Sequence, residues 1–93
     1  MSTIETTVAA YGAAMRRERR SPKGIRRYMD CLRHLVEWDG GRDVREITKA
    51  DLSAFEAWWW DDFEARNGRE PAEATVAAMQ VAVIQYFGYL EQE

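Results

Sequence analysis

The sequence is poor in the residues that build disulfides and metal sites. It contains one cysteine, Cys31, and one histidine, His34. A single cysteine cannot form an internal disulfide, which argues against the disulfide-rich class of small secreted domains. Cys31 and His34 have no third partner, whereas a zinc site takes three or four ligands. The sequence therefore predicts no metal.

Long apolar runs, targeting signals and glycine-rich phosphate loops are also missing. Hydrophobic residues make up 46% of the chain, but they never form the ~18 consecutive apolar residues of a membrane span. The first residues do not show the charged and then apolar segments of a secretory signal. We expect no membrane partner, no nucleotide or other cofactor, and a cytoplasmic location.

The spacing of the apolar residues predicts an all-α protein. A chain of 93 residues suits one small domain, so we expect residues 1–93 to share a single core. Apolar positions recur at helical spacing in four segments, and none shows the alternation of a strand. The sequence therefore predicts a single four-helix bundle.

Capping signals indicate the bounds of the first two helices. The first is predicted over residues 3–19. Ser21 followed by Pro22 is typical of a helix start, because the serine hydroxyl accepts from a first-turn amide and proline lacks an amide that would need a partner. The second helix is predicted to end at Gly40 and Gly41 in a left-handed conformation.

Two further helices complete the predicted bundle. Thr48 and Asp51 resemble a capping box, and Asn67 with Gly68 is expected to end this third helix. The fourth helix lacks a good cap and is predicted from within 71–74 to about residue 91. Its predicted inward residues are Val76, Met79, Val83, Phe87 and Leu90. The predicted common core contains Ile25, Leu32, Phe55, Trp59, Val83 and Phe87.

Three consecutive tryptophans stand in the third predicted helix. Successive helical positions point about 100 degrees apart, so the three rings cannot all enter one core. We expect Trp59 inside and Trp58 and Trp60 on the shoulders of the bundle. The flanking rings either pack laterally against neighbouring helices, or one of them stays partly exposed and docks against a partner.

Basic residues are concentrated in one short segment of an acidic chain. Seven of the 13 basic residues fall within positions 16–27, although the formal net charge is -3. Residues 16–33 carry a local charge of +6, and all other residues together carry -9. Such a segment is either a solvated helix face or a binding surface for an anionic partner.

Helical geometry places part of this charge at a helix start. Lys23, Arg26 and Arg27 fall opposite the apolar face of the second predicted helix. The arginines before them lead into its first turn, where free amides and the positive end of the helix dipole favour an anion such as phosphate. Several guanidinium groups at one place are typical of contacts with a nucleic-acid backbone. The pattern favours contact with a phosphate backbone.

Three segments resemble the N-terminal core-binding, or SAM-like, domain of phage integrases and tyrosine recombinases. The first is SPKGIRRYMDCLRHLVEW, which is similar to the family pattern S-P-x-T-hydrophobic-x-x-Y followed by three variable residues and L. The other two are ITKADLSAF and ATVAAMQVAVIQYFGYL, the latter with the family's aromatic pair and Y-L ending. The resemblance covers about residues 8–90.

This resemblance implies a domain that binds DNA during site-specific recombination and integration without acting on it. In the family the domain forms half of a clamp around DNA, and the transesterification chemistry resides in a separate C-terminal domain. We therefore expect no catalytic residue in this chain and a catalytic domain outside it. The implied partners are double-stranded DNA, the C-terminal catalytic domain of the same protein, and further copies in a homo-oligomer on DNA.

The resemblance also indicates which residues face DNA, with two departures. Gly24 stands where the family often has threonine, and Ala77, Ala78 and Met79 stand where it commonly has asparagine and arginine. Residues near the start of the fourth helix are expected to compensate. The resemblance implies two groups of DNA-binding residues. Those around the start of the second helix are Arg16, Arg17, Arg19, Arg20, Lys23, Gly24, Arg26 and Arg27. Those near the start of the fourth helix are Arg69 and Thr75, to which Arg66 could add a further positive charge.

The remaining candidate groups are interpreted as structural. Tyr11 and Tyr28 lie on inward stripes, and Tyr86 and Tyr89 flank an aromatic near the end of the fourth helix, so none is expected to be a nucleophile. His34 is expected on the outward face of the second helix. A second hypothesis stays open: the net acidity and the alanines of the fourth helix also suit a helical protein-interaction module that has lost DNA binding.

Overall fold

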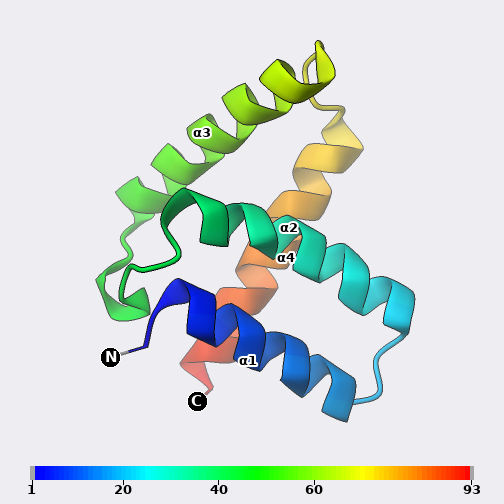
Figure 1. Ribbon diagram of the computed structural model, residues 1–93, viewed down its shortest axis with the longest axis vertical. Coiled ribbons are helices and arrows are strands. Elements are labelled where there is room, and N and C mark those ends of the chain that lie inside the picture. Colours follow the sequence, from blue (N-terminus) through cyan, green and yellow to red (C-terminus); the bar gives the residue numbers. More distant parts are fainter. Residues whose placement is uncertain (1, 93) are drawn as a thin grey trace.

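The computed structural model describes residues 2–92, which are almost entirely helical (Figure 1). Its elements are α1 (Ile4–Arg17), α2 (Pro22–Asp39), the short 3-10 helix η1 (Val44–Glu46), α3 (Lys49–Asn67) and α4 (Glu73–Glu91). These elements confirm the predicted all-α, four-helix bundle. None of the described helices has the length and apolar character that crossing a membrane requires.

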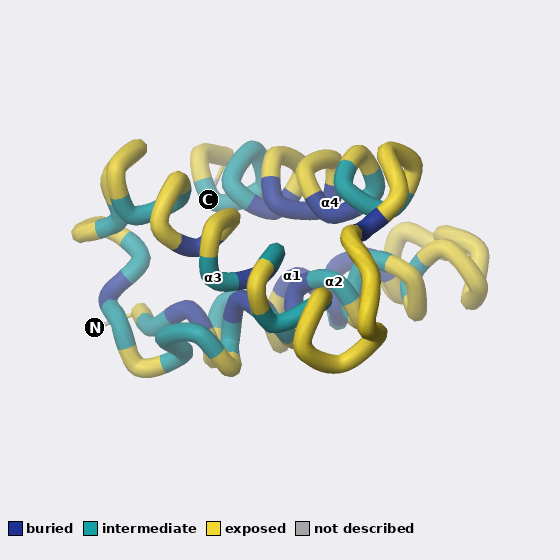
Figure 2. The backbone as a smooth tube through the Cα atoms, turned by 90° about the horizontal axis from the view of Figure 1, so that it is seen from above, coloured by how far each residue is buried: buried dark blue, intermediate teal, exposed yellow. Residues whose placement is uncertain are grey.

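The helix α2 is the centre of the bundle and packs against α1, α3 and α4. α1 and α2 run side by side in opposite directions, and α4 crosses them on one side (Figures 1 and 2). The Cα atoms extend over 37 × 31 × 17 Å, so the molecule is flat. Figure 2 shows the consequence for α4, whose buried residues face the other helices while its opposite side is exposed.

One apolar core joins all four helices. Trp59 is buried in this core with 4% exposure, while Trp58 and Trp60 pack half-buried against it, as predicted. Burial of these side chains is the main favourable contribution to folding. The buried cluster contains Ile4, Val8, Tyr11, Met15, Leu32, Leu35, Phe55, Trp59, Met79, Val83 and Tyr86.

The predicted core was wrong at its edges. Ile25 and Phe87 are only partly buried against the core. The fully buried aromatic of α4 is instead Tyr86, whose hydroxyl is hydrogen-bonded to the hydroxyl of Thr7 on α1. Because α4 is apolar on nearly every side, spacing alone did not distinguish its inner face. A buried tyrosine needs a polar partner, and Thr7 supplies it.

The end of α2 was predicted at the right place for the wrong reason. Gly40 follows the last residue of α2, but it has right-handed dihedral angles, φ -62° and ψ -23°. A Cβ atom at Gly40 would lie 2.7 Å from the carbonyl oxygen of Val36. The Gly40 carbonyl also accepts the amide of Glu5 at 2.9 Å. Glycine is therefore needed for close approach and not for a left-handed turn.

The other helix ends follow the predictions more closely. Gly68 ends α3 in the left-handed region with φ 68°, and α4 begins at Glu73 without a side-chain cap. The first helix ends at Arg17, two residues earlier than predicted. The reason is a left-handed residue in the connection to α2, which also shapes the candidate interface.

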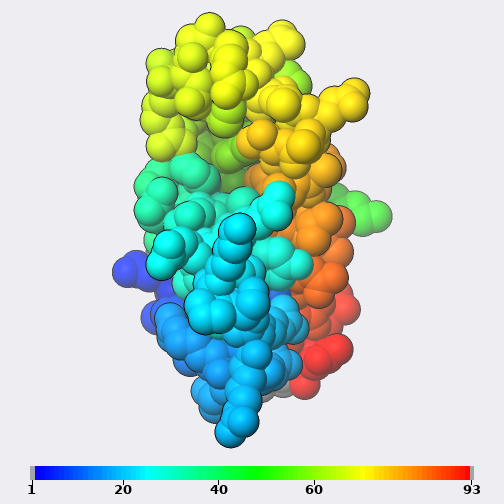
Figure 3. Space-filling view, turned by 90° about the vertical axis from the view of Figure 1, so that its right-hand side faces the viewer, coloured from blue at the N-terminus to red at the C-terminus, as the bar shows by residue number. Residues whose placement is uncertain are grey.

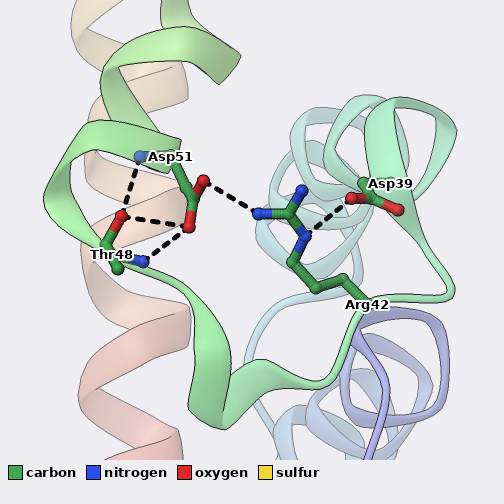
Figure 4. A network of polar contacts seen from close by, with 4 residues as sticks. All are labelled: Asp39, Arg42, Thr48 and Asp51. Carbon is green, nitrogen blue, oxygen red and sulfur yellow. Dashed lines mark hydrogen bonds and ion pairs between the residues drawn. The ribbon is translucent and has the colours of Figure 1, made fainter.

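A polar network joins the end of α2 to the start of α3 (Figure 4). The Asp51 amide donates to the Thr48 hydroxyl at 3.2 Å, and the Thr48 amide donates to the Asp51 carboxylate at 2.9 Å, which confirms the capping box. Arg42 donates to Asp51 at 2.8 Å and to Asp39 at 2.7 Å. These bonds, that of the Thr48 amide first, hold the pKa of Asp51 below its ordinary value.

We expect this network to make part of the stability sensitive to acid. Asp51 has a lower pKa in the folded state than in the unfolded state, where it is about 3.9. Its contribution is therefore complete above that value and is lost as the pH falls through the folded pKa. Thermal melts from neutral to acid pH should show a shallower acid decline for Asp51→Asn than for wild type. Asp61→Asn, which removes an exposed carboxylate of α3 outside the network, should keep the wild-type slope; an equal effect of both variants would contradict the prediction.

Candidate nucleic-acid interface

The clustered basic residues lie at the corner where α1 passes into α2. Two stand in the last turn of α1, two in the connection, and three in the first two turns of α2, and all seven are exposed. Figure 3 shows this segment, in blue and cyan, projecting from the face of the molecule. We call it the basic corner, and it consists of Arg16, Arg17, Arg19, Arg20, Lys23, Arg26 and Arg27.

The basic corner is almost free of acidic partners. Among the described residues, its only ion pair joins Arg20 to Glu18 at 3.4 Å. Most arginines outside the corner are paired, such as Arg42 with two aspartates and Arg66 with Asp62 at 2.6 Å. Six cations of the corner therefore lack an internal counter-charge within residues 2–92.

A left-handed residue makes the sharp turn of the corner. Arg19 has φ 58°, a conformation that glycine adopts more readily. The Arg19 amide donates to the Arg16 carbonyl at 3.1 Å, and the Arg20 amide donates to the Met15 carbonyl at 3.2 Å. These two bonds form a Schellman motif that ends α1. Arg19 thus occupies a backbone position at which glycine would be more stable.

We expect Arg19→Gly to stabilise the protein. The exchange removes the clash of Cβ in the left-handed region, and the free energy of unfolding should rise by up to about 1 kcal/mol. Thermal or denaturant unfolding measures this change. The matched control is Arg17→Gly, within α1, which should lower stability by about 1 kcal/mol. A loss of stability in Arg19→Gly would show that the arginine side chain, and not the backbone, dominates here.

The start of α2 offers fewer free amides than the sequence suggested. Ser21 accepts the amide of Gly24 at 3.0 Å, and Pro22 has no amide to donate. Within the first three positions only the Lys23 amide is left for an anion. The prediction of several free backbone amides was therefore wrong, because the Ser21 hydroxyl occupies one first-turn amide and Pro22 lacks one. Side chains must supply most of any anion binding at this corner.

The helix dipole explains the basic residues at the end of α1 but not those at the start of α2. Arg16 and Arg17 stand in the last turn of α1, where the negative end of the helix dipole favours cations. The first turn of α2 has no acidic residue and instead holds Lys23, opposite to what its positive dipole end favours. The helix dipole therefore does not account for the position of Lys23 at the start of α2.

A shallow hollow of about 450 Å³ opens within the corner. Arg16, Arg20 and Arg26 stand around it, and Ile25 and Met29 contribute apolar surface. Ile25 was predicted to lie in the core, but it is partly exposed, and its exposed side forms part of the apolar floor of this hollow. The hollow thus combines positive charge with a small apolar surface, which suits a phosphate attached to a sugar.

Arg69 and Thr75 do not belong to the basic corner. Arg69 lies in the connection between α3 and α4, where its guanidinium stands 5.6 Å from the centre of the Phe63 ring. Figures 1 and 3 place this connection, in yellow, at the end of the long axis away from the corner. Thr75 is half-buried in the first turn of α4. The structure therefore separates Arg69 from the basic corner, whereas Thr75 follows Ala74, which lines a hollow together with Arg27 of the corner.

The outer surface of α4 carries no charge of its own. Residues 74–90 contain no charged side chain. Two cations of the corner reach this helix. Arg27 does so across a hollow of about 400 Å³ lined also by Tyr28, Ala74 and Ala78, and Arg20 lines a second hollow with Ile84 and Gly88. The structure offers nothing on α4 that compensates for the missing asparagine and arginine of the family pattern.

The histidine and the cysteine of α2 are not free surface groups. His34 was predicted on the outward face, but its side chain is 16% exposed and its Nδ1 accepts from the Arg66 guanidinium at 3.2 Å. Burial, followed by the charge of Arg66, lowers the pKa of His34. Burial raises the pKa of the Cys31 thiol. No group of three or more metal-ligating side chains occurs within residues 2–92.

Two of the tyrosines are buried. Tyr11 is 2% exposed, and Tyr86 is fully enclosed. Burial raises the pKa of both phenols above the ordinary value. Tyr28 and Tyr89 are half-buried and pack against the core. Buried phenols of raised pKa are poor nucleophiles, since attack requires an accessible oxygen that loses its proton.

Comparisons of this chain with protein-family models, with curated proteins and with solved structures found no match.

Proposed function

We propose that this protein binds double-stranded DNA through the basic corner. The observation that supports this proposal is the group of six exposed cations without acidic partners in a chain of net charge -3. Keeping like charges together costs electrostatic energy, and an anionic polymer removes that cost. Arginine predominates, and its planar guanidinium matches phosphate oxygens in a two-pronged geometry.

The acidity of the remaining surface is compatible with this proposal. Charges separated by more than about 8 Å are largely screened at physiological salt. The molecule extends 37 Å along its longest axis, so much of the acidic surface lies beyond that distance. A duplex at the corner would interact mainly with the local positive charge.

The proposed contacts are with the sugar-phosphate backbone. The cations of the corner suit phosphates, and the apolar floor beside them suits deoxyribose carbons. Reading a base requires hydrogen-bonding groups directed into a groove, and the exposed face of α4 offers few of them. We therefore propose binding with little sequence preference by this chain alone.

The wider proposal follows the resemblance to the core-binding domain of tyrosine recombinases. In it, this chain positions DNA, has no catalytic role, and works beside a catalytic domain of the same protein in the cytoplasm. The single, half-buried Cys31 suits a reducing compartment.

The test is the salt dependence of binding to a fluorescently labelled duplex, measured by anisotropy. If four cations of the corner each neutralise one phosphate, log K should fall against log salt concentration with a slope of about -3.6. Duplexes of unrelated sequence should give similar values. Absence of binding at low salt would overturn the proposal.

A second candidate function is a protein-interaction module. The observation that favours it is the exposure of Val81 and Ile84 on α4, 45% and 67%. Exposed apolar patches commonly mark docking surfaces. Failure of DNA binding together with a protein partner that contacts α4 would favour this function.

A further inference from the structure

The helix α4 has an apolar surface on two opposite sides. One side enters the core through Met79, Val83 and Tyr86. The other faces solvent and carries Val81 and Ile84, the two large apolar side chains that are exposed within residues 2–92. A helix that is apolar all round is normally covered on all sides. The outer side of α4 therefore lacks the cover that its composition requires.

The exposed apolar residues follow the spacing of a helix-pairing seam. They recur at alternating steps of three and four residues, which is the a and d pattern of a coiled coil. Four of them are exposed, and the last is half-buried. This row, the outer seam, consists of Ala74, Ala77, Val81, Ile84 and Gly88.

The charges beside the outer seam are compatible with binding of a second copy of the same surface. The flanking positions Ala78, Gln80 and Gln85 carry no charge. Arg27 of α2 and Glu56 of α3 line hollows beside α4, and Glu18 and Arg20 line a further hollow beside Ile84, so the charges of the two signs balance. A second copy therefore meets no excess of like charge, whereas a strongly charged helix would find few counter-charges.

The sizes of the seam residues also match in an antiparallel pair. With two α4 helices antiparallel and centred near Met79, Ala74 lies opposite Ile84 of the second copy and Ala77 lies opposite Val81. Each branched residue then faces an alanine, which lets two helices interdigitate at close distance. A two-fold axis repeats each contact, as a symmetric dimer requires.

We propose that the outer seam is a self-association surface through which two copies pair, α4 against α4. Arg27 of the basic corner borders the outer seam, but self-association does not require DNA binding. A single pair of helices about four turns long buries less than the roughly 1,200 Å² at which stable interfaces begin. The dimer is therefore weak and reversible, and it forms as the protein concentration rises.

The test is sedimentation equilibrium from micromolar to millimolar concentration. The average mass of the wild type should rise from the monomer towards the dimer. Ile84→Glu and Ile84→Lys, which place either sign of charge in the seam, should both stay monomeric. Ala57→Glu, on the exposed face of α3, should dimerise like the wild type. All variants should melt like the wild type at low concentration, since these positions are exposed.

Disulfide trapping tests the orientation. In a Cys31→Ser background, Ala74→Cys combined with Ile84→Cys should give a covalent dimer on oxidation, whereas Ala74→Cys alone should not. A wild type that stays monomeric at millimolar concentration would overturn the proposal. So would a dimer that survives both Ile84 variants, or trapping by Ala74→Cys alone, which indicates parallel helices.

Discussion

Replacing Trp59 by alanine is expected to lower the free energy of unfolding by about 3 to 5 kcal/mol. Trp59 is 4% exposed within the shared core, and its ring centre lies 5.8 Å from that of Phe63. Truncation removes a large apolar surface and leaves a cavity that fixed helices fill only in part. A domain of 93 residues has a total stability of only about 5 to 14 kcal/mol. The variant should therefore be partly or wholly unfolded at physiological temperature.

The adjacent tryptophan provides a control of identical chemistry. Trp60→Ala removes the same side chain from a half-buried position, so its cost should be clearly smaller. Chemical denaturation followed by circular dichroism measures both variants. Equal costs at the two positions would mean that Trp59 is not the more deeply buried ring. Strand-like spectra of the wild type would contradict the helical fold itself.

Replacing both Arg26 and Arg27 by alanine is expected to weaken DNA binding to all sequences alike. Both side chains are exposed and make no ion pair within residues 2–92. If each contacts one phosphate, the slope of log K against log salt concentration should become shallower by about 2, half of the proposed total. Loss of a base contact would instead relax sequence preference. The effect should lie in binding, since surface exchanges change stability by about 0.5 kcal/mol or less.

The control variant loses the same number of positive charges, but at positions outside the basic corner. Arg33→Ala combined with Lys49→Ala removes two positive charges, of which Arg33 is already 3.9 Å from Glu37. This variant should nearly retain the wild-type slope. Equal slopes for both double variants would show that net charge, and not the corner, controls binding. A slope unchanged in Arg26→Ala with Arg27→Ala would move the interface elsewhere.

Much of the local structure could be predicted from the sequence. The capping box at Thr48, the start of α2 after Ser21 and the end of α3 at Gly68 are present as predicted. Each depends on hydrogen bonds or dihedral angles within a few residues, so neighbours in the chain suffice to specify it. The exposure of Arg26 and Arg27 follows from the same cause, because α2 is clearly amphipathic and its helical period separates the two faces.

The inner face of α4, the pairing of the charges and the extent of the basic corner were decided only by the tertiary structure. Residues 74–90 are uncharged, so their period gave no unique inward side, and contact between Tyr86 and Thr7 on a distant helix selected it. The separation of Arg69 from the basic corner depends on where α3 carries the chain. Sequence patterns report the preferences of neighbours, whereas burial and charge pairing depend on which distant residues the packed helices bring together.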